Sequence, residues 1–202
     1  MKNLLLTIAF ITLCLPVFSQ SNKGMGFRGG TNISTLTNAN LDFKVNAYIG
    51  MFYQSRISDY YAIQPELGYS NQGGKTKDNR HIYVEYLSIN ITNKFFMVPN
   101  TGLYALVSPG LDFDIDDTPI GLANRTKNGG NGATFIDVNL SFGLGLEFKN
   151  GLAIEARYKH GFIDVYSGSF HNFDSELYQD KNQFNSVFQI GIAYKFNLTK
   201  KE

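Results

Sequence analysis

The chain has 202 residues, with 20 glycines, 17 phenylalanines and 12 tyrosines but only 5 prolines, a composition typical of all-β proteins. Its 18 lysines and arginines nearly balance its 17 aspartates and glutamates, giving a net charge of +1. This balance argues against a basic nucleic-acid-binding surface, and we expect no nucleic acid partner.

Residues 1–19 have the features of a secretion signal peptide. Lys2 supplies a positive start, an apolar run follows from Leu4 to Leu15, and small residues precede Gln20. The apolar run is too short to span a bilayer as a helix, which needs about 20 residues. Cleavage removes Cys14, the single cysteine, so thiol chemistry is excluded in the mature chain. We expect one domain, residues 20–202.

Eight segments of the mature chain alternate apolar with small or polar residues. A period of two indicates a strand with one apolar and one polar face. The predicted strands are residues 24–33, 43–54, 60–70, 82–95, 102–114, 133–148, 152–163 and 184–196.

The connections between these segments alternate in length. The short ones are 55–59, 96–101 and 149–151, and the last contains the Asn150-Gly151 pair that is typical of hairpins. The longer, polar ones are 34–42, 71–81, 115–132 and 164–183. This predicts an eight-stranded antiparallel up-and-down transmembrane β-barrel in the cell outer membrane, with short periplasmic turns and long extracellular loops.

Residue size decides which face of the wall points outward. The polar face is rich in glycine, serine and asparagine, whose small side chains suit the narrow interior of an eight-stranded barrel. Interior glycines weaken a strand, so a water-facing position gives no reason for them. We therefore expect the apolar face to contact lipid. The alternative is a soluble, lipocalin-like periplasmic carrier with an apolar interior.

The same register places six cations and six carboxylates inside. They are Arg28, Lys44, Lys94, Arg157, Lys159 and Lys195 against Glu66, Asp112, Asp114, Asp137, Glu147 and Glu155. Because buried charges must be paired, we predict a self-neutralising network that plugs the barrel. The site residues that we assign to this network are Arg28, Glu66, Asp137, Glu155, Arg157 and Lys159. Arg28, Glu66, Glu155 and Arg157 should lie near mid-height, with the two arginines paired to the two glutamates. A small ion or proton path is the alternative.

No motif predicts a catalytic, cofactor or metal site. The run from Asp112 to Asp117 resembles a calcium loop, but it has Asp117 where glycine is needed and Ala123 where glutamate is needed. The acidic run therefore fits an outer rim better. A lipid-modifying hydrolase would need a histidine, a serine and a carboxylate; His160 and His171 are candidates, but nothing fixes a triad.

The order of motifs resembles the PorT-like outer membrane β-barrel family, within the small OmpA/OmpX-type barrels of Gram-negative bacteria. The matching segments are 26–30 (GFRGG), 63–70 (IQPELGYS), 86–87 (YL) and 156–158 (ARY). The resemblance implies an outer membrane barrel, with a link to protein secretion for some members.

We therefore expect a non-enzymatic outer membrane protein that acts in envelope structure, loop-mediated binding or secretion. Apolar residues of the last long loop are candidate contacts, namely Phe170, Phe173, Leu177 and Tyr178. The expected partners are outer membrane lipids, the barrel assembly machinery and an envelope or secretion protein. The alternatives are the lipid-modifying hydrolase and the periplasmic carrier.

Overall fold

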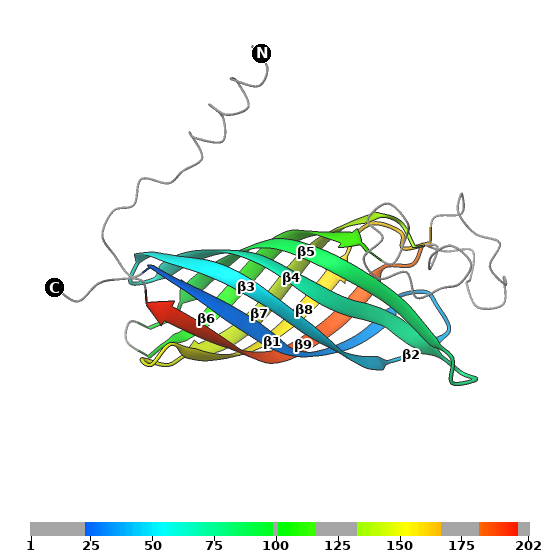
Figure 1. Cartoon of the computed structure of the whole chain (residues 1–202), viewed down its shortest axis with the longest axis horizontal. Coiled ribbons are helices and arrows are strands. Elements are labelled where there is room, and N and C mark those ends of the chain that lie inside the picture. Colours follow the sequence, from blue (N-terminus) through cyan, green and yellow to red (C-terminus); the bar gives the residue numbers. More distant parts are fainter. Residues whose placement is uncertain (1–22, 99–100, 116–132, 167–181, 198–202) are drawn as a thin grey trace, which may run out of the picture.

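The computed structural model describes residues 23–98, 101–115, 133–166 and 182–197. Within them, eight long strands and one two-residue strand form a closed antiparallel barrel (Figure 1). The strands are β1 (Lys23–Leu36), β2 (Leu41–Asp42), β3 (Lys44–Ser58), β4 (Tyr61–Thr76), β5 (His81–Phe96), β6 (Leu103–Asp114), β7 (Ile136–Glu147), β8 (Leu152–Gly161) and β9 (Asn185–Asn197). In this part of the chain, no helix is long and apolar enough to cross a membrane.

Pairing between the first and last long strands closes the barrel. β1 and β9 run antiparallel from the Gly24–Asn197 pair to the Leu36–Asn185 pair. The other long strands pair with their neighbours in chain order, as the sequence predicted. The short β2 pairs with the end of β4 that lies away from the short turns, which we call the outer end of the barrel. Closure removes the free edges of the sheet, which would otherwise leave backbone groups unpaired.

One end of the barrel carries short turns, as predicted. The turn between β7 and β8 is closed by a hydrogen bond from the Gly151 amide to the Phe148 carbonyl. Gly151 has a φ of 90°, and a β-carbon there would lie 2.3 Å from the Lys195 carbonyl oxygen. Only glycine meets both conditions, which explains the strong hairpin signal of this pair.

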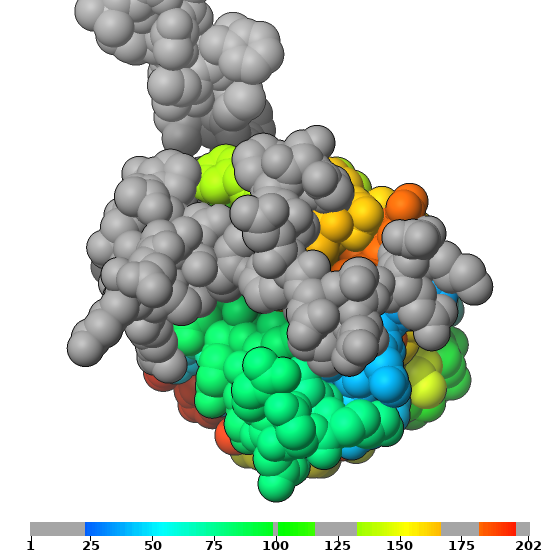
Figure 2. Space-filling view, turned by 90° about the vertical axis from the view of Figure 1, so that its right-hand side faces the viewer, coloured from blue at the N-terminus to red at the C-terminus, as the bar shows by residue number. Residues whose placement is uncertain are grey.

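The prediction of a long loop at residues 71–81 was wrong. β4 continues to Thr76 and β5 begins at His81, so a paired hairpin projects at the outer end (Figures 1 and 2). A polar segment can form strands here because the pairing depends on backbone hydrogen bonds, and this hairpin extends beyond the apolar wall of the barrel. The turn itself is only 77–80, with Asn79 at a φ of 71°.

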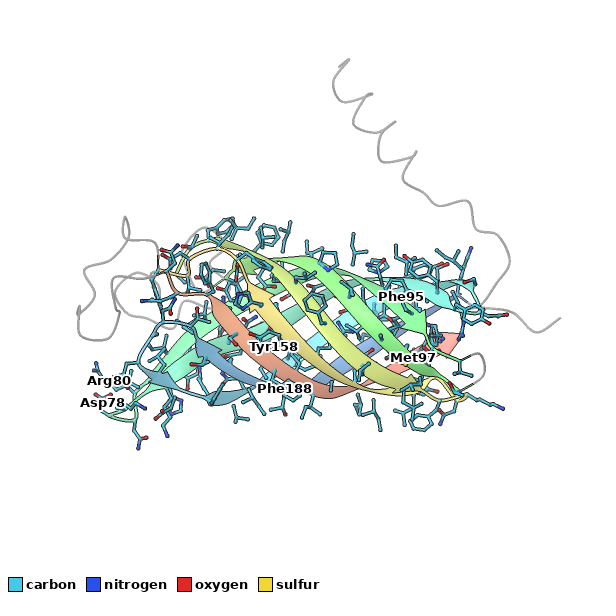
Figure 3. All side chains as sticks on the ribbon, turned by 180° about the vertical axis from the view of Figure 1, so that it is seen from behind. Asp78, Arg80, Phe95, Met97, Tyr158 and Phe188 are labelled. Carbon is cyan, nitrogen blue, oxygen red and sulfur yellow. The ribbon has the colours of Figure 1, made fainter. Side chains whose placement is uncertain are left out.

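The alternation of faces agrees with the predicted orientation. Ile154 and Ile190 on the outer face are each 49% exposed, whereas Arg157 and Gln189 are 2% and 5% exposed. Seen from behind, Phe95 and Met97 lie toward the end opposite Asp78 and Arg80 at the tip of the hairpin (Figure 3). The lipocalin-like alternative is wrong, because the interior is lined by charged and polar side chains.

Candidate functional site

The most distinctive group of polar side chains lies at mid-height inside the barrel. Arg28 comes from β1, Glu66 from β4, Lys94 from β5, and Glu155 and Arg157 from β8. Each occupies an inward position of its strand, and each is at least nine-tenths buried. We call these five residues the central ion-pair cluster. The barrel thus brings together charges that are up to 129 residues apart in sequence (28 to 157).

Glu66 is the carboxylate of the cluster that accepts more hydrogen bonds. Arg28 Nη1 donates to its Oε2 at 2.8 Å, and Arg157 contributes Nη1 to Oε2 at 3.1 Å and Nη2 to Oε1 at 2.9 Å. Gln64 and Thr92 donate to Oε1 at 2.7 and 2.6 Å. Both carboxylate oxygens therefore face only donors, which favours the ionised form.

Glu155 is the second carboxylate of the cluster. Arg157 Nη2 lies 2.7 Å from its Oε2, and Lys94 Nζ lies 3.1 Å from its Oε1. The Tyr104 hydroxyl also donates to Oε1 at 2.6 Å. Arg157 thus bridges the two glutamates, so the predicted pairing of Arg28 and Arg157 with Glu66 and Glu155 is observed, with Lys94 added.

Smaller ion pairs continue the network toward both ends. Lys195 pairs with Glu147 near the short turns, and Gln54 donates to the same carboxylate at 3.1 Å. Lys159 pairs with Asp112 on the outer side, where both side chains are almost fully buried. These ion pairs therefore lie at successive levels along the barrel axis.

Asp137 takes a different role from the one predicted. Its hydrogen-bond donors among the described residues are neutral. They are Asn185 Nδ2 at 3.0 Å and the backbone amides of Phe162 and Ile163 at 3.1 and 3.0 Å. Asp137 therefore anchors the chain just after β8, at the outer mouth. It belongs to the polar interior but ties down backbone instead of pairing a cation.

Apolar side chains lie in the interior on both sides of the central ion-pair cluster. At the outer mouth, a buried cluster contains Leu36, Val84, Tyr86, Ala133, Val165 and Tyr166. Two clusters lie near the short turns, formed by Ala62, Phe96, Tyr104 and Leu106 and by Phe52, Ala153 and Ala193. We call these the outer and inner apolar plugs.

The plugs contain the residues that sequence reasoning missed. Tyr86 and Tyr104 share the parity of the inward serines on their strands, so the period of two was a signal that could have found them. Val165 and Tyr166 fall in what was predicted to be a loop, yet they are 1% and 8% exposed. Their inward position follows from tertiary contacts that no local pattern reveals.

Two other candidate sites can be placed only in part. Asp112 and Asp114 of the acidic run are fully buried, which agrees with their predicted inward positions on the strand and not with an outer rim. The remaining acidic residues of that run lie outside the described residues, as do His171 and the four candidate loop contacts. Within the described ranges, no group of three or more histidines, cysteines or carboxylates could hold a metal ion.

His160 lies on the outer face among aromatic side chains. Its Nδ1 is 3.5 Å from the Tyr158 hydroxyl, which lies 3.1 Å from Ser186 Oγ. The rings of Phe162 and Phe184 lie 5.3 and 6.0 Å from the imidazole. Tyr158 is labelled on this face in Figure 3. This arrangement resembles an interfacial aromatic belt.

The tip of the β4–β5 hairpin is held by its own side chains. Asp78 accepts hydrogen bonds from Thr76 and, at 2.7 Å, from Arg80 Nε. The Thr76 hydrogen bond, followed by that from Arg80, lowers the pKa of Asp78 below its ordinary value of 3.8. The carboxylate therefore stays ionised in mildly acidic solution.

Comparisons with known proteins agree with this architecture. A family model described as the outer membrane protein beta-barrel domain matches residues 5–196. Among curated protein sequences, none matches the chain.

The chain is similar to several solved structures at low sequence identity. Neisserial surface protein A is 11% identical, with 87% of this chain and 98% of that chain covered and a TM-score of 0.48. Ail, the attachment invasion locus protein of Yersinia pestis, is 12% identical, with 88% and 100% covered and a TM-score of 0.44. OprG from Pseudomonas aeruginosa is 11% identical, with 88% and 97% covered and a TM-score of 0.42.

Proposed function

Given that the chain belongs to the outer membrane protein β-barrel family and lies in the outer membrane, we propose that it is a closed, non-enzymatic barrel that binds partners at its outer end. Within the family, the motif resemblance supports placement among the PorT-like barrels. The observation that supports a closed barrel is that side chains fill its interior. Outer membrane lipids surround the wall, and the barrel assembly machinery inserts it.

The central ion-pair cluster supports a non-conducting interior. Glu66 and Glu155 are held by two arginines and a lysine, and all five side chains cross the space that a pore would need. Opening a path would break several charge-assisted hydrogen bonds at once, each worth about 1.5–3 kcal/mol. An eight-stranded barrel is just wide enough for such side chains to fill it.

The apolar plugs strengthen this argument. An ion that entered from the outer end would meet Tyr86 and Val165, and one from the short-turn end would meet Phe96 and Tyr104, before it reached the central ion-pair cluster. Transferring an ion into an apolar constriction carries a large desolvation penalty. Function is then left to surfaces outside the barrel.

The outer end offers the surface for binding. The β4–β5 hairpin extends beyond the other described strands at this end (Figure 1) and carries charged side chains at its tip. Rigid scaffolds commonly present binding residues on such connections. An envelope or secretion protein would contact this hairpin, and the four predicted loop residues, Phe170, Phe173, Leu177 and Tyr178, would add apolar contacts.

Planar-bilayer recording tests the closed interior. The purified protein should give no steady conductance, and reproducible single-channel steps would overturn the plug. Incubation with labelled phospholipid or lipid A tests the absence of catalysis. Turnover that is lost in His160→Ala would replace the proposal with the hydrolase alternative.

Site-specific photocrosslinking in intact cells tests the binding surface. A photoreactive residue at Arg80, on the outer hairpin, should give protein adducts, whereas one at Lys149, in a short turn, should not. Adducts at Lys149 alone would contradict outer-end binding and favour a periplasmic complex. Adducts at neither position would overturn the binding role.

A further inference from the structure

One row of inward positions contains two adjacent glycines. Cross-strand pairing aligns Arg28 with Gly50, Gly50 with Gly68, and Gly68 with Ser88. This row crosses four strands. Arg28 has a long side chain, Gly50 and Gly68 have none, and Ser88 has a short hydroxyl. Between Arg28 and Ser88 the wall contributes no side chain to fill the interior.

A cavity lies beside this glycine pair. Its volume is about 30 Å³, and its lining includes Arg28, Gly50, Gly68 and Ser88. A water molecule needs roughly 10–15 Å³ of such volume, so the space admits a small ligand of one or two heavy atoms. We call it the Arg28–Ser88 cavity.

Donors without partners line this cavity. Arg28 Nε and Nη2 and Ser88 Oγ are buried and have no hydrogen-bond partner among the described residues. Arg28 Nη2 lies 3.7 Å from Glu155 Oε2, within ion-pair range but beyond hydrogen-bond distance. Because guanidinium nitrogens only donate, the atoms that remain to be satisfied call for an acceptor.

The local charge also favours an acceptor that is negative. The central ion-pair cluster holds three cations and two carboxylates, and both carboxylates are engaged by those cations. Lys159, which also lines the cavity, is neutralised by Asp112. The central ion-pair cluster therefore has one more cation than carboxylates, in a medium where a charge without a partner is costly.

We infer that the Arg28–Ser88 cavity is a binding site for a small inorganic anion of halide size. The anion accepts hydrogen bonds from Arg28 and Ser88, and the Gly50–Gly68 pair supplies its space. It balances the charge of the central ion-pair cluster, so it acts as a structural ion of the barrel.

Bromide provides a direct probe of this site. Crystals of the mature protein grown with bromide in place of chloride should show an anomalous peak within hydrogen-bond distance of Arg28 Nε and Ser88 Oγ. In detergent solution, replacing gluconate by chloride at constant ionic strength should raise the melting temperature by about 3 to 6 °C at ten times the dissociation constant.

Two serine variants separate a built site from a chance one. Ser88→Ala removes one donor and should weaken halide binding about tenfold. Ser108→Ala is the matched control, because Ser108 is equally buried but bonds to Thr92 and does not line the cavity. Its halide affinity should be unchanged, and circular dichroism would show that both variants fold.

Several outcomes would overturn the inference. Water density without an anomalous peak would make the cavity a hydration site. A bromide peak of the same strength in Ser88→Ala would mark an adventitious ion only. Equal melting temperatures in chloride and gluconate would show that no anion contributes to the fold.

Discussion

Replacing Glu66 by glutamine should destabilise the barrel more than any exposed substitution. The carboxylate accepts five hydrogen bonds, three at Oε1 and two at Oε2, all from Arg28, Arg157, Gln64 and Thr92. Glutamine keeps the shape but places an NH₂ group against donors in either orientation. It also leaves the two arginines with one fewer negative charge.

The magnitude follows from these contacts. Removing one partner from a buried ion pair costs about 3–5 kcal/mol. For a chain of this size, 1 kcal/mol corresponds to a melting-temperature change of about 2–4 °C. Glu66→Gln should therefore lower the melting temperature by on the order of 10 °C, measured in detergent micelles by the loss of β-sheet circular dichroism.

Two further variants make this test specific. Asp78→Asn changes an exposed carboxylate in the hairpin and should leave the melting temperature almost unaltered. The double variant Glu66→Gln with Arg28→Gln should lose less than the sum of the single changes, because the two side chains contact each other. An unchanged melting temperature for Glu66→Gln would refute the stabilising pairing of Glu66 with Arg28 and Arg157.

Three other predictions concern separate parts of the fold. Lys159→Met leaves Asp112 buried without its cation and should lower stability by about 3–5 kcal/mol in urea titrations. Gly191→Val should prevent folding, because a β-carbon there lies 2.2 Å from the Tyr48 hydroxyl and 2.3 Å from a backbone oxygen. The Asp78 carboxyl should titrate below pH 3.8 by NMR, since its folded pKa is lowered. Its contribution to hairpin stability is thus full above that pH and is lost as the pH falls through the folded pKa.

Each of these three has a matched comparison. Lys149→Met, in an exposed short turn, should not change the urea midpoint. Gly29→Val adds a side chain on the outer face, where the nearest atom to a β-carbon is 3.3 Å away, and should still fold. An Asp78 titration midpoint at or above 3.8 would contradict the hydrogen bonds described at the hairpin tip.

The wall of the barrel was predictable because a strand repeats every two residues. Once Arg157 is assigned inward, Glu155 and Lys159 must follow, and Ile154 and Tyr158 must face outward. Ion pairs across the interior were also predictable where the two residues lie at the same depth, as Arg28 and Glu66 do. The contribution of Lys94 to Glu155 depends on the stagger between distant strands, which no single segment encodes.

The ends of the barrel were harder to predict. The stretch from Asn71 to Arg80 is polar and reads as a loop, but pairing with the next strand keeps it extended to Thr76. Val165 and Tyr166 turn inward because the chain after β8 is anchored to Asp137. Such positions are decided by contacts between segments, so local composition misleads.

The Arg157–Glu66 pair joins two strands that are synthesised far apart in time, because they are far apart in the sequence. Glu66 lies in the third long strand and Arg157 in the seventh, 91 residues later. Until the later strand arrives, Glu66 has no more than part of its compensation, and a bare carboxylate is poorly tolerated in hydrocarbon. A nascent barrel that lacks β8 would therefore carry only partly compensated charges into the bilayer, so insertion should wait for nearly the whole polypeptide. Translation that stops before Arg157 should yield no membrane-embedded fragment at all.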